Sequence, residues 1–118
     1  MANPDTSYKL YYFAGFGRAE PIRMMLTHAN CEWRDMKVAF DQWPKLKPTA
    51  PNGQMPFLQL RDGTKLGESY AISRYLGSIH GYYPADPRLA YEVDYLLEGV
   101  EPLGMAIFKL LYAKSGYE

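Results

Sequence analysis

This sequence of 118 residues carries no excess of either charge, because its 13 basic and 13 acidic residues cancel and are interspersed. Such a chain offers no basic patch for nucleic acid and no surface suited to an anionic membrane. It also has no long apolar run and no charged segment followed by an apolar one near its start. Because these patterns are absent, we expect no transmembrane span and no secretory signal, and we expect a cytoplasmic protein.

Cysteine is nearly absent from the chain. The one residue, Cys31, has no internal disulfide partner, which fits a reducing compartment, and we expect a small, partly buried side chain rather than a nucleophile. No Cys-x-x-Cys motif is present, which excludes dithiol redox chemistry. The two histidines, His28 and His80, stand alone, so no metal site is expected.

Hydrophobic residues, in contrast, make up 47% of the chain, which is enough for a packed core. The length suits one domain, or one domain and the start of another. Tyrosine is unusually common, with 11 residues, and most of them are expected in amphipathic packing.

The pattern of apolar residues predicts an α/β domain over residues 8–81, after a flexible tail at 1–7. Strands are expected at 8–13, at 32–38, directly after Pro56, and at 65–67 beyond an Asp62-Gly63 hairpin turn. Helical segments are expected at 19–30, at 40–47, and from Ser69 to Gly77 or Gly81. A βαβ unit followed by a ββα unit is the thioredoxin-like arrangement, with a mixed four-stranded sheet and helices on its faces.

A proline-containing linker at 82–87 precedes a long amphipathic helix at 88–118. Pro102, between Gly99 and Gly104, is expected to kink this helix. A single apolar helix needs a partner surface, which is the first domain, sequence beyond this chain, or another chain.

The segment Gln54-Met55-Pro56-Phe57-Leu58 has a proline that cannot donate a hydrogen bond to a sheet. Such a proline lies at the first position of a strand or at a sheet edge, where it can leave the preceding backbone exposed. Glu68-Ser69 then opens a helix. An exposed peptide unit beside a helix N-terminus can hold a peptide with a free carboxylate.

These residues resemble the cytosolic glutathione transferases, and the sigma class most closely, which includes the prostaglandin D synthases and the S-crystallins. The resemblance rests on five blocks in the family's order: 8–13, 17–23, 43–48, 53–56 and 68–76. It implies a thioredoxin-like domain that binds glutathione, joined to an all-helical domain whose first helix is 88–118. It also implies a homodimer, or a partner chain on that helix.

Tyr12 matches the family's catalytic tyrosine, which stabilises the glutathione thiolate. A neutral tyrosine hydroxyl donates one hydrogen bond, and such a bond to an ionised group contributes about 1.5–3 kcal/mol. That would lower the thiol pKa by roughly one to two units. The alternative is a packed strand aromatic. Neighbouring Tyr11 should face the opposite side of the sheet and be structural.

The resemblance assigns the other glutathione contacts to the loops that follow the strands. Glu68 and Ser69 match the pair that binds the γ-glutamyl end, although Ser69 could be a plain helix N-cap. Met55 would pair with the cysteinyl backbone. The remaining matches are Pro56, expected after a cis bond, Gly53 and Gln54 in the same turn, and Trp43 and Lys47 at the glycyl end.

Arg18 matches an arginine beside the catalytic tyrosine. It supplies positive potential near the sulfur, or it anchors the loop by pairing with Glu20 or another acidic residue. Both readings are open from the sequence.

Two classes of function are compatible with the sequence. The first is a glutathione transferase that conjugates the thiolate to an electrophile, or a glutathione-dependent isomerase of the prostaglandin synthase type, with glutathione as co-substrate. The second is a structural or interaction subunit like the S-crystallins. Pro102 favours the second, because dimeric relatives have an aspartate there that reaches the partner's glutathione.

Overall fold

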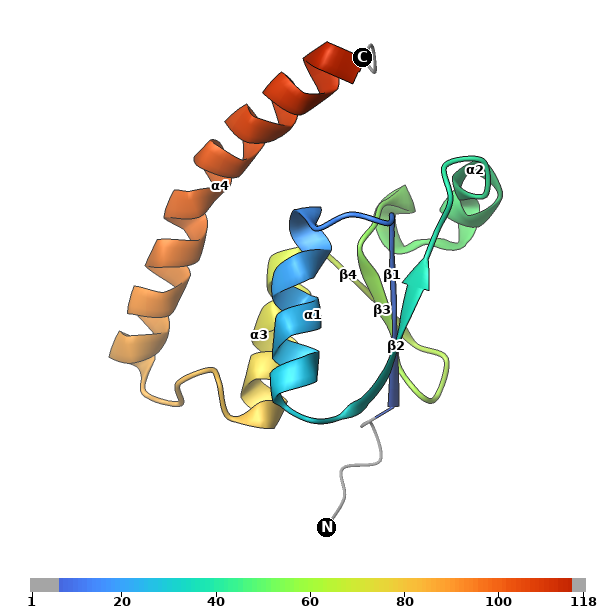
Figure 1. Cartoon of the computed structure of the whole chain (residues 1–118). Coiled ribbons are helices and arrows are strands. Elements are labelled where there is room, and N and C mark those ends of the chain that lie inside the picture. The colour runs from blue at the N-terminus through green and yellow to red at the C-terminus, as the bar shows by residue number, and fades with distance from the viewer. Residues whose placement is uncertain (1–6, 116–118) are drawn as a thin grey trace. The chain divides into compact units, whose positions relative to one another are not determined.

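The computed structural model describes residues 7–115, and side chains up to residue 111 (Figure 1). Contacts divide the chain after Tyr82 into two units, residues 1–82 and 83–118. The predicted tail at 1–7 lies outside the described residues except for Ser7, which begins the first strand.

A four-stranded mixed sheet forms the centre of the first unit, in the order β2-β1-β3-β4. Strand β1 (Ser7–Tyr12) pairs in parallel with β2 (Glu32–Lys37). On its other side β1 pairs antiparallel with β3 (Phe57–Gln59), which pairs antiparallel with β4 (Lys65–Gly67). The sheet confirms the predicted thioredoxin-like α/β class.

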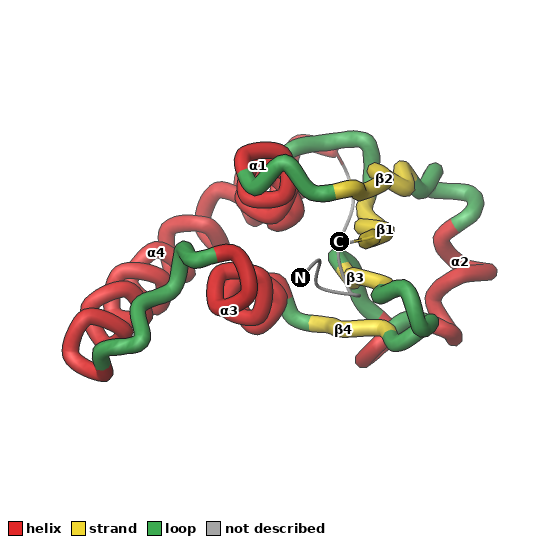
Figure 2. Tube along the Cα trace, turned by 90° about the horizontal axis from the view of Figure 1, so that it is seen from below, coloured by secondary structure: helices red, strands yellow, loops and turns green. Residues whose placement is uncertain are grey.

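Helices α1 (Glu20–His28) and α3 (Ser69–His80) lie side by side on one face of the sheet, and the short helix α2 (Trp43–Leu46) lies beyond the strands on the other side (Figure 2). Apolar side chains fill the space between the sheet and the two long helices. Those that are at most 1% exposed include Leu10, Ile22, Leu26, Ile72 and Leu76. The burial of each such side chain contributes about 1.5–3 kcal/mol to the free energy of folding.

Two helix ends differ from the prediction or refine it. Helix α1 ends at His28 rather than at Asn30, because Asn30 adopts a left-handed φ of 53° and its N–H bonds to Thr27 O instead of continuing the i→i−4 pattern. Of the two predicted ends of α3, Gly81 is the cap, with a φ of 82°. Gly77 is buried inside the helix.

The predicted helical stretch at 40–47 begins only at Trp43, with Pro44 in its first turn. Two 3-10 turns follow, at Lys47–Thr49 and Pro51–Gly53. Three prolines in eight residues, Pro44, Pro48 and Pro51, remove backbone donors and keep the helices short.

The described part of the second unit contains one helix, α4 (Pro87–Ser115), which continues without interruption through Pro102 (Figure 1). The Asp86 carboxylate accepts from the Leu89 N–H at 2.9 Å and caps its start. Large apolar side chains remain exposed along it, among them Leu96, Leu103 and Leu110. None of the helices in the described part of the chain is long and apolar enough to span a membrane.

Candidate functional site

One end of the sheet gathers the ends of three strands. The register pairs Tyr11 with Phe57, and Phe57 with Gly67. The last residues of β1, the first of β3 and the last of β4 therefore lie in one row across the sheet. The sequence motifs follow or precede this row directly: they are Tyr12, Met55-Pro56 and Glu68-Ser69.

Tyr12 lies at this end with its ring in the core and only 8% of its surface exposed. Its hydroxyl oxygen accepts a hydrogen bond from the Arg18 backbone N–H at 3.3 Å. Because this bond occupies the oxygen as an acceptor, the hydroxyl proton can be donated to another atom. Tyr11 points to the other face, as predicted, and stacks on Phe57 with ring centroids 4.4 Å apart.

Gly17 makes the approach of the Arg18 amide possible. It has a φ of 42°, and a Cβ there would overlap the Tyr12 hydroxyl oxygen and lie 3.0 Å from the ring carbon that bears it. Arg18 thus contributes its backbone amide to Tyr12, a role that side-chain matching did not reveal. The Glu20 carboxylate forms an ion pair with Arg23, with Oε2 3.1 Å from Nη1.

The turn at 51–53 packs against the end of β4. A Cβ at Gly67 would lie 2.8 Å from Pro51 Cβ, so only glycine fits there. A Cβ at Gly53 would lie 3.7 Å from Lys47 Cε, so the Lys47 chain runs past Gly53. Gln54 follows, and its N–H donates to Pro51 O at 3.2 Å.

Asn52 connects this turn to the start of α3. It has a φ of 54°, and its amide Nδ2 donates to Glu68 Oε1 at 3.2 Å. Sequence reasoning missed this residue, although Asn52-Gly53 is a dipeptide that favours left-handed turns. The bond leaves Glu68 with one carboxylate oxygen that this amide does not use.

The start of α3 differs from a plain N-cap at Ser69. Glu68 occupies the cap position with a φ of 67°, and the Ile72 N–H bonds to Glu68 O at 2.9 Å. Ser69 is the first helical residue, so the capping alternative for Ser69 is wrong. Ser69 therefore belongs to the first turn of α3, whose backbone amides carry partial positive charge and suit a carboxylate.

The Met55–Pro56 peptide bond is cis, as the resemblance implied. Pro56 is buried and lies immediately before Phe57, the first residue of β3, so it borders the strand instead of occupying the expected first position or an edge strand. Met55 is partly buried against the core, so its backbone is the part of the residue at the row of strand ends.

An aromatic cluster adjoins Tyr12. The Phe13 ring lies 5.8 Å from the Tyr12 ring and 6.1 Å from the Trp43 ring, measured between centroids. Phe40 stacks on Phe13 at 4.8 Å and is 67% exposed. Trp43 therefore lies next to Phe13, which in turn lies next to Tyr12. The sequence reasoning did not identify Phe13 and Phe40 as members of this cluster.

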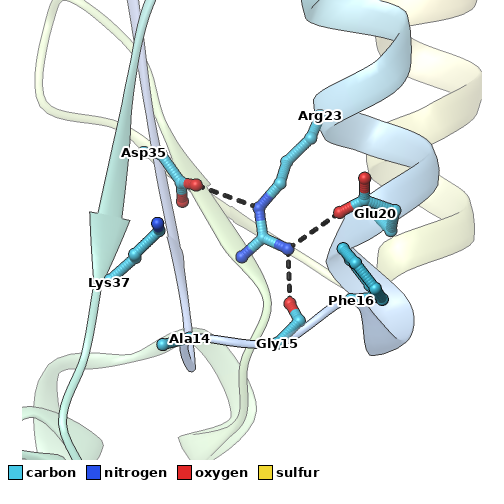
Figure 3. Close-up of a pocket in the computed structure, with 7 residues that line it drawn as sticks. All are labelled: Ala14, Gly15, Phe16, Glu20, Arg23, Asp35 and Lys37. Atoms are coloured by element: carbon cyan, nitrogen blue, oxygen red, sulfur yellow. Dashed lines mark hydrogen bonds and ion pairs between the residues drawn. The ribbon is translucent and has the colours of Figure 1, made fainter.

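A pocket of about 390 Å³ lies between the turn after Tyr12, the first residues of α1 and the end of β2 (Figure 3). It contains none of the predicted glutathione contacts. Its lining residues are Ala14, Gly15, Phe16, Glu20, Arg23, Asp35 and Lys37.

The cysteine and the two histidines make contacts within the fold and lie outside the predicted glutathione contacts. Cys31 Sγ donates to Leu26 O at 3.3 Å, and burial raises the pKa of this thiol, which disfavours the nucleophilic thiolate. His80 Nε2 lies 3.1 Å from the Tyr8 hydroxyl, and His28 Nδ1 contacts the Tyr82 hydroxyl. Among the described residues no group of His, Cys, Asp and Glu side chains could hold a metal ion.

Known proteins are similar to this chain in sequence and in fold. Residues 8–78 match the model of the glutathione S-transferase N-terminal domain. A glutathione S-transferase of Anopheles gambiae is 38% identical over 109 residues, which cover 92% of this chain and 52% of that protein. S-crystallin SL20-1 of Nototodarus sloanii is 31% identical over 110 residues, covering 93% and 50%. The structure of prostaglandin synthase D of Nilaparvata lugens aligns with a TM-score of 0.80 at 35% identity, covering 87% and 51%.

The chain spans about half the length of the curated relatives it matches. The matched segment contains every predicted glutathione contact, from Tyr12 to Ser69. The order of the strands and the match over most of the first unit lead to one conclusion: the chain belongs to the glutathione transferase family.

Proposed function

We propose that this chain supplies the glutathione-binding part of a glutathione transferase, with the thiol of glutathione held at the Tyr12 hydroxyl. The observation that carries the proposal is the 3.3 Å hydrogen bond from the Arg18 amide to the Tyr12 oxygen. It directs the hydroxyl so that its own proton is donated outward. Glutathione is the co-substrate of this family.

The proposed chemistry is nucleophilic attack by sulfur. The thiol loses its proton to solvent, and the Tyr12 hydroxyl stabilises the thiolate by about 1.5–3 kcal/mol, as expected for a hydrogen bond to a charged group. The sulfur then forms a bond to an electrophilic carbon, whose leaving group departs or whose double-bond electrons take up a proton. In the isomerase variant, suggested by the prostaglandin synthase relative, the thiolate is released again after rearrangement.

The other contacts hold the peptide. Glu68, fixed by Asn52, accepts from the γ-glutamyl ammonium, and Ser69 with the first amides of α3 binds the γ-glutamyl carboxylate. The backbone at Gly53, Gln54 and Met55, before Pro56, pairs with the cysteinyl unit. The glycyl carboxylate lies against two side chains, Trp43 and Lys47.

The second unit has a separate proposed role. We infer that residues 82–87 are a linker and that α4 begins a helical domain which contributes to the electrophile site. The exposed leucines of α4 suit a homodimer or a partner chain. A cytoplasmic location fits the single reduced cysteine.

An S-crystallin-like subunit without catalysis is the second candidate. The 31% identity to an S-crystallin and the proline at position 102 favour it. The two candidates differ in whether bound glutathione is ionised.

The test is a titration of the 118-residue chain with glutathione, followed by calorimetry for binding and by ultraviolet absorbance for the thiolate. We expect binding with a thiolate signal that Tyr12→Phe abolishes. Tyr11→Phe is the matched control, because Tyr11 lies on the opposite face and should leave the signal intact. Binding without a thiolate signal, by a folded chain, would support the S-crystallin-like role and contradict the transferase.

A further inference from the structure

We propose that Arg23 is a positioning residue for the Tyr12 hydroxyl, because it ties the turn after Tyr12 to strand β2 and to helix α1. The inference rests on the proposed function, in which Tyr12 donates to the glutathione thiolate. It assigns a role to Arg23 in the pocket between this turn, α1 and β2 (Figure 3).

The guanidinium of Arg23 holds the turn through two carbonyl groups. Nη1 donates to Gly15 O, and Nη2 donates to Phe13 O at 3.2 Å. The Gly15 N–H also donates to Phe13 O, at 2.8 Å, so the turn is bonded to itself and to Arg23. The Arg23 side chain is only 11% exposed, and its bond to Phe13 O is partly buried, which limits competition with water at that bond.

Two carboxylates fix the guanidinium from opposite sides (Figure 3). Glu20 Oε2 lies 3.1 Å from Nη1 on the same helix, and Asp35 Oδ2 lies 3.2 Å from Nε across the gap to β2. The planar fork of arginine can satisfy carbonyl and carboxylate acceptors at once, which the single ammonium of lysine cannot do with the same geometry. Arg23 therefore joins three elements: β2, α1 and the turn.

In the described part of the chain, the ion pair between Arg23 and Asp35 leaves buried polar atoms without hydrogen bonds, which lowers its contribution to the stability of the fold. Among the described residues, the buried Asp35 Oδ1 and Arg23 Nε have no hydrogen-bond partner, so the pair is an ion pair without an aligned hydrogen bond. A buried polar atom left without a hydrogen bond lowers the stability of the fold. Because this partly buried ion pair costs stability, its presence is better explained by a role in positioning the neighbouring turn than by a role in stabilising the fold.

The turn connects Arg23 to the reacting end of Tyr12. Arg23 holds Phe13 and Gly15 of this turn, and Gly15 lies two residues before Gly17. The backbone of Gly17 and Arg18 contacts the Tyr12 hydroxyl. The Arg23 Cζ also lies 5.8 Å from the centre of the Tyr12 ring, within the range of a cation–π contact. Arg23 thus restrains the hydroxyl through the Arg18 amide and the ring through its charge.

The test compares Arg23→Gln and Arg23→Lys with the parent chain in two measurements. The first is the pH titration of the thiolate absorbance of bound glutathione. The second is the affinity for S-methylglutathione, which has no thiol to ionise. We expect about tenfold less thiolate at a fixed pH below the midpoint, equal to a midpoint roughly one unit higher, with S-methylglutathione affinity unchanged.

The matched control is Arg34→Gln, which removes the same charge from an exposed position on β2 next to Asp35 and should leave both measurements unchanged. If Arg23→Gln does not fold, Asp35→Asn is the second variant, since it keeps the shape and removes the ion pair. It should move the midpoint in the same direction by a smaller amount.

Two outcomes would overturn the proposal. One is a folded Arg23→Gln chain with an unchanged thiolate midpoint. The other is an equal loss of S-methylglutathione affinity, which would make Arg23 a support for the whole site rather than for Tyr12. Absence of a thiolate signal in the parent chain is a different result, because it contradicts the proposed function itself.

Discussion

The backbone of Gly17 lies against the hydroxyl of Tyr12 so closely that no side chain fits between them. The two residues are five positions apart in the chain, and the turn that separates them returns the backbone to the ring. The contact makes the turn as much a part of the candidate site as the tyrosine.

Gly17→Ala should therefore displace the hydroxyl of Tyr12. The added Cβ would overlap this oxygen, and the left-handed φ of 42° adds a strain of about 1–2 kcal/mol for a residue with a side chain. We expect a lower free energy of unfolding in urea and loss of most of the thiolate absorbance of bound glutathione.

Gly63→Ala is the matched control for backbone strain. Gly63 has a φ of 90° in the hairpin turn, and a Cβ there would meet nothing within 4 Å. It should lower the free energy of unfolding by the backbone strain alone, without the overlap that Gly17→Ala adds, and leave the thiolate signal intact. Equal loss of the signal in both variants would mean that the contact with Tyr12 does not matter.

Asn52→Gly should weaken glutathione binding through Glu68. Glycine keeps the left-handed backbone at φ 54° and removes only the amide that donates to Glu68 Oε1 at 3.2 Å. Since both side chains are exposed, we expect about 0.5–1.5 kcal/mol, or roughly a threefold to tenfold loss of affinity by calorimetry.

A double-mutant cycle with Glu68→Gln separates the two residues. If Asn52 acts by orienting Glu68, the loss caused by Asn52→Gly should shrink when Glu68→Gln is already present. Losses that simply add would contradict this coupling.

Cys31 should react slowly in the folded chain. Burial disfavours the thiolate and raises the pKa of Cys31, so less thiolate is present at a given pH. We expect iodoacetamide to modify the native chain more slowly at pH 8.5 than the urea-unfolded chain. Equal rates in the two states would contradict the raised pKa.

The same shift gives a dependence of stability on pH. A thiol with a raised pKa in the folded state favours folding below its unfolded pKa of about 8.5, and this contribution is lost as the pH rises through the folded pKa. Between the unfolded and the folded pKa of this thiol, the free energy of unfolding should fall more steeply with pH for the parent chain than for Cys31→Ala, which lacks the titrating group.

The sequence predicts the fold well because its strongest signals are local. Pro56 before an apolar pair, the turn at Asp62-Gly63 and the apolar stripe of α1 each restrict the backbone by themselves. The Asp62 side chain does accept from the Thr64 N–H at 2.8 Å, as expected of this turn. The end of α1 was placed too late because Asn30, a common left-handed cap residue, was read as part of the helix.

The contacts of the site that the sequence does not predict join residues from different elements, and they depend on how those elements are aligned in the fold. Asn52 meets Glu68 across 16 positions, and Arg23 meets Asp35 only because β2 lies beside β1. Neither pair leaves a periodic pattern in the sequence. The contact of Gly17 with Tyr12 was missed for a related reason, since Gly15 and Gly17 look alike in the sequence and only one of them touches the ring.

The order of the strands also determines how the sheet meets solvent. Its two edges are β2, which carries Glu32, Arg34, Asp35 and Lys37, and β4, which is only three residues long. Charged and very short edge strands are poor templates for an incoming strand from another molecule. The sheet is therefore protected against growth by edge-to-edge pairing, and self-association of this chain should proceed through helix surfaces rather than through amyloid-like stacking of strands.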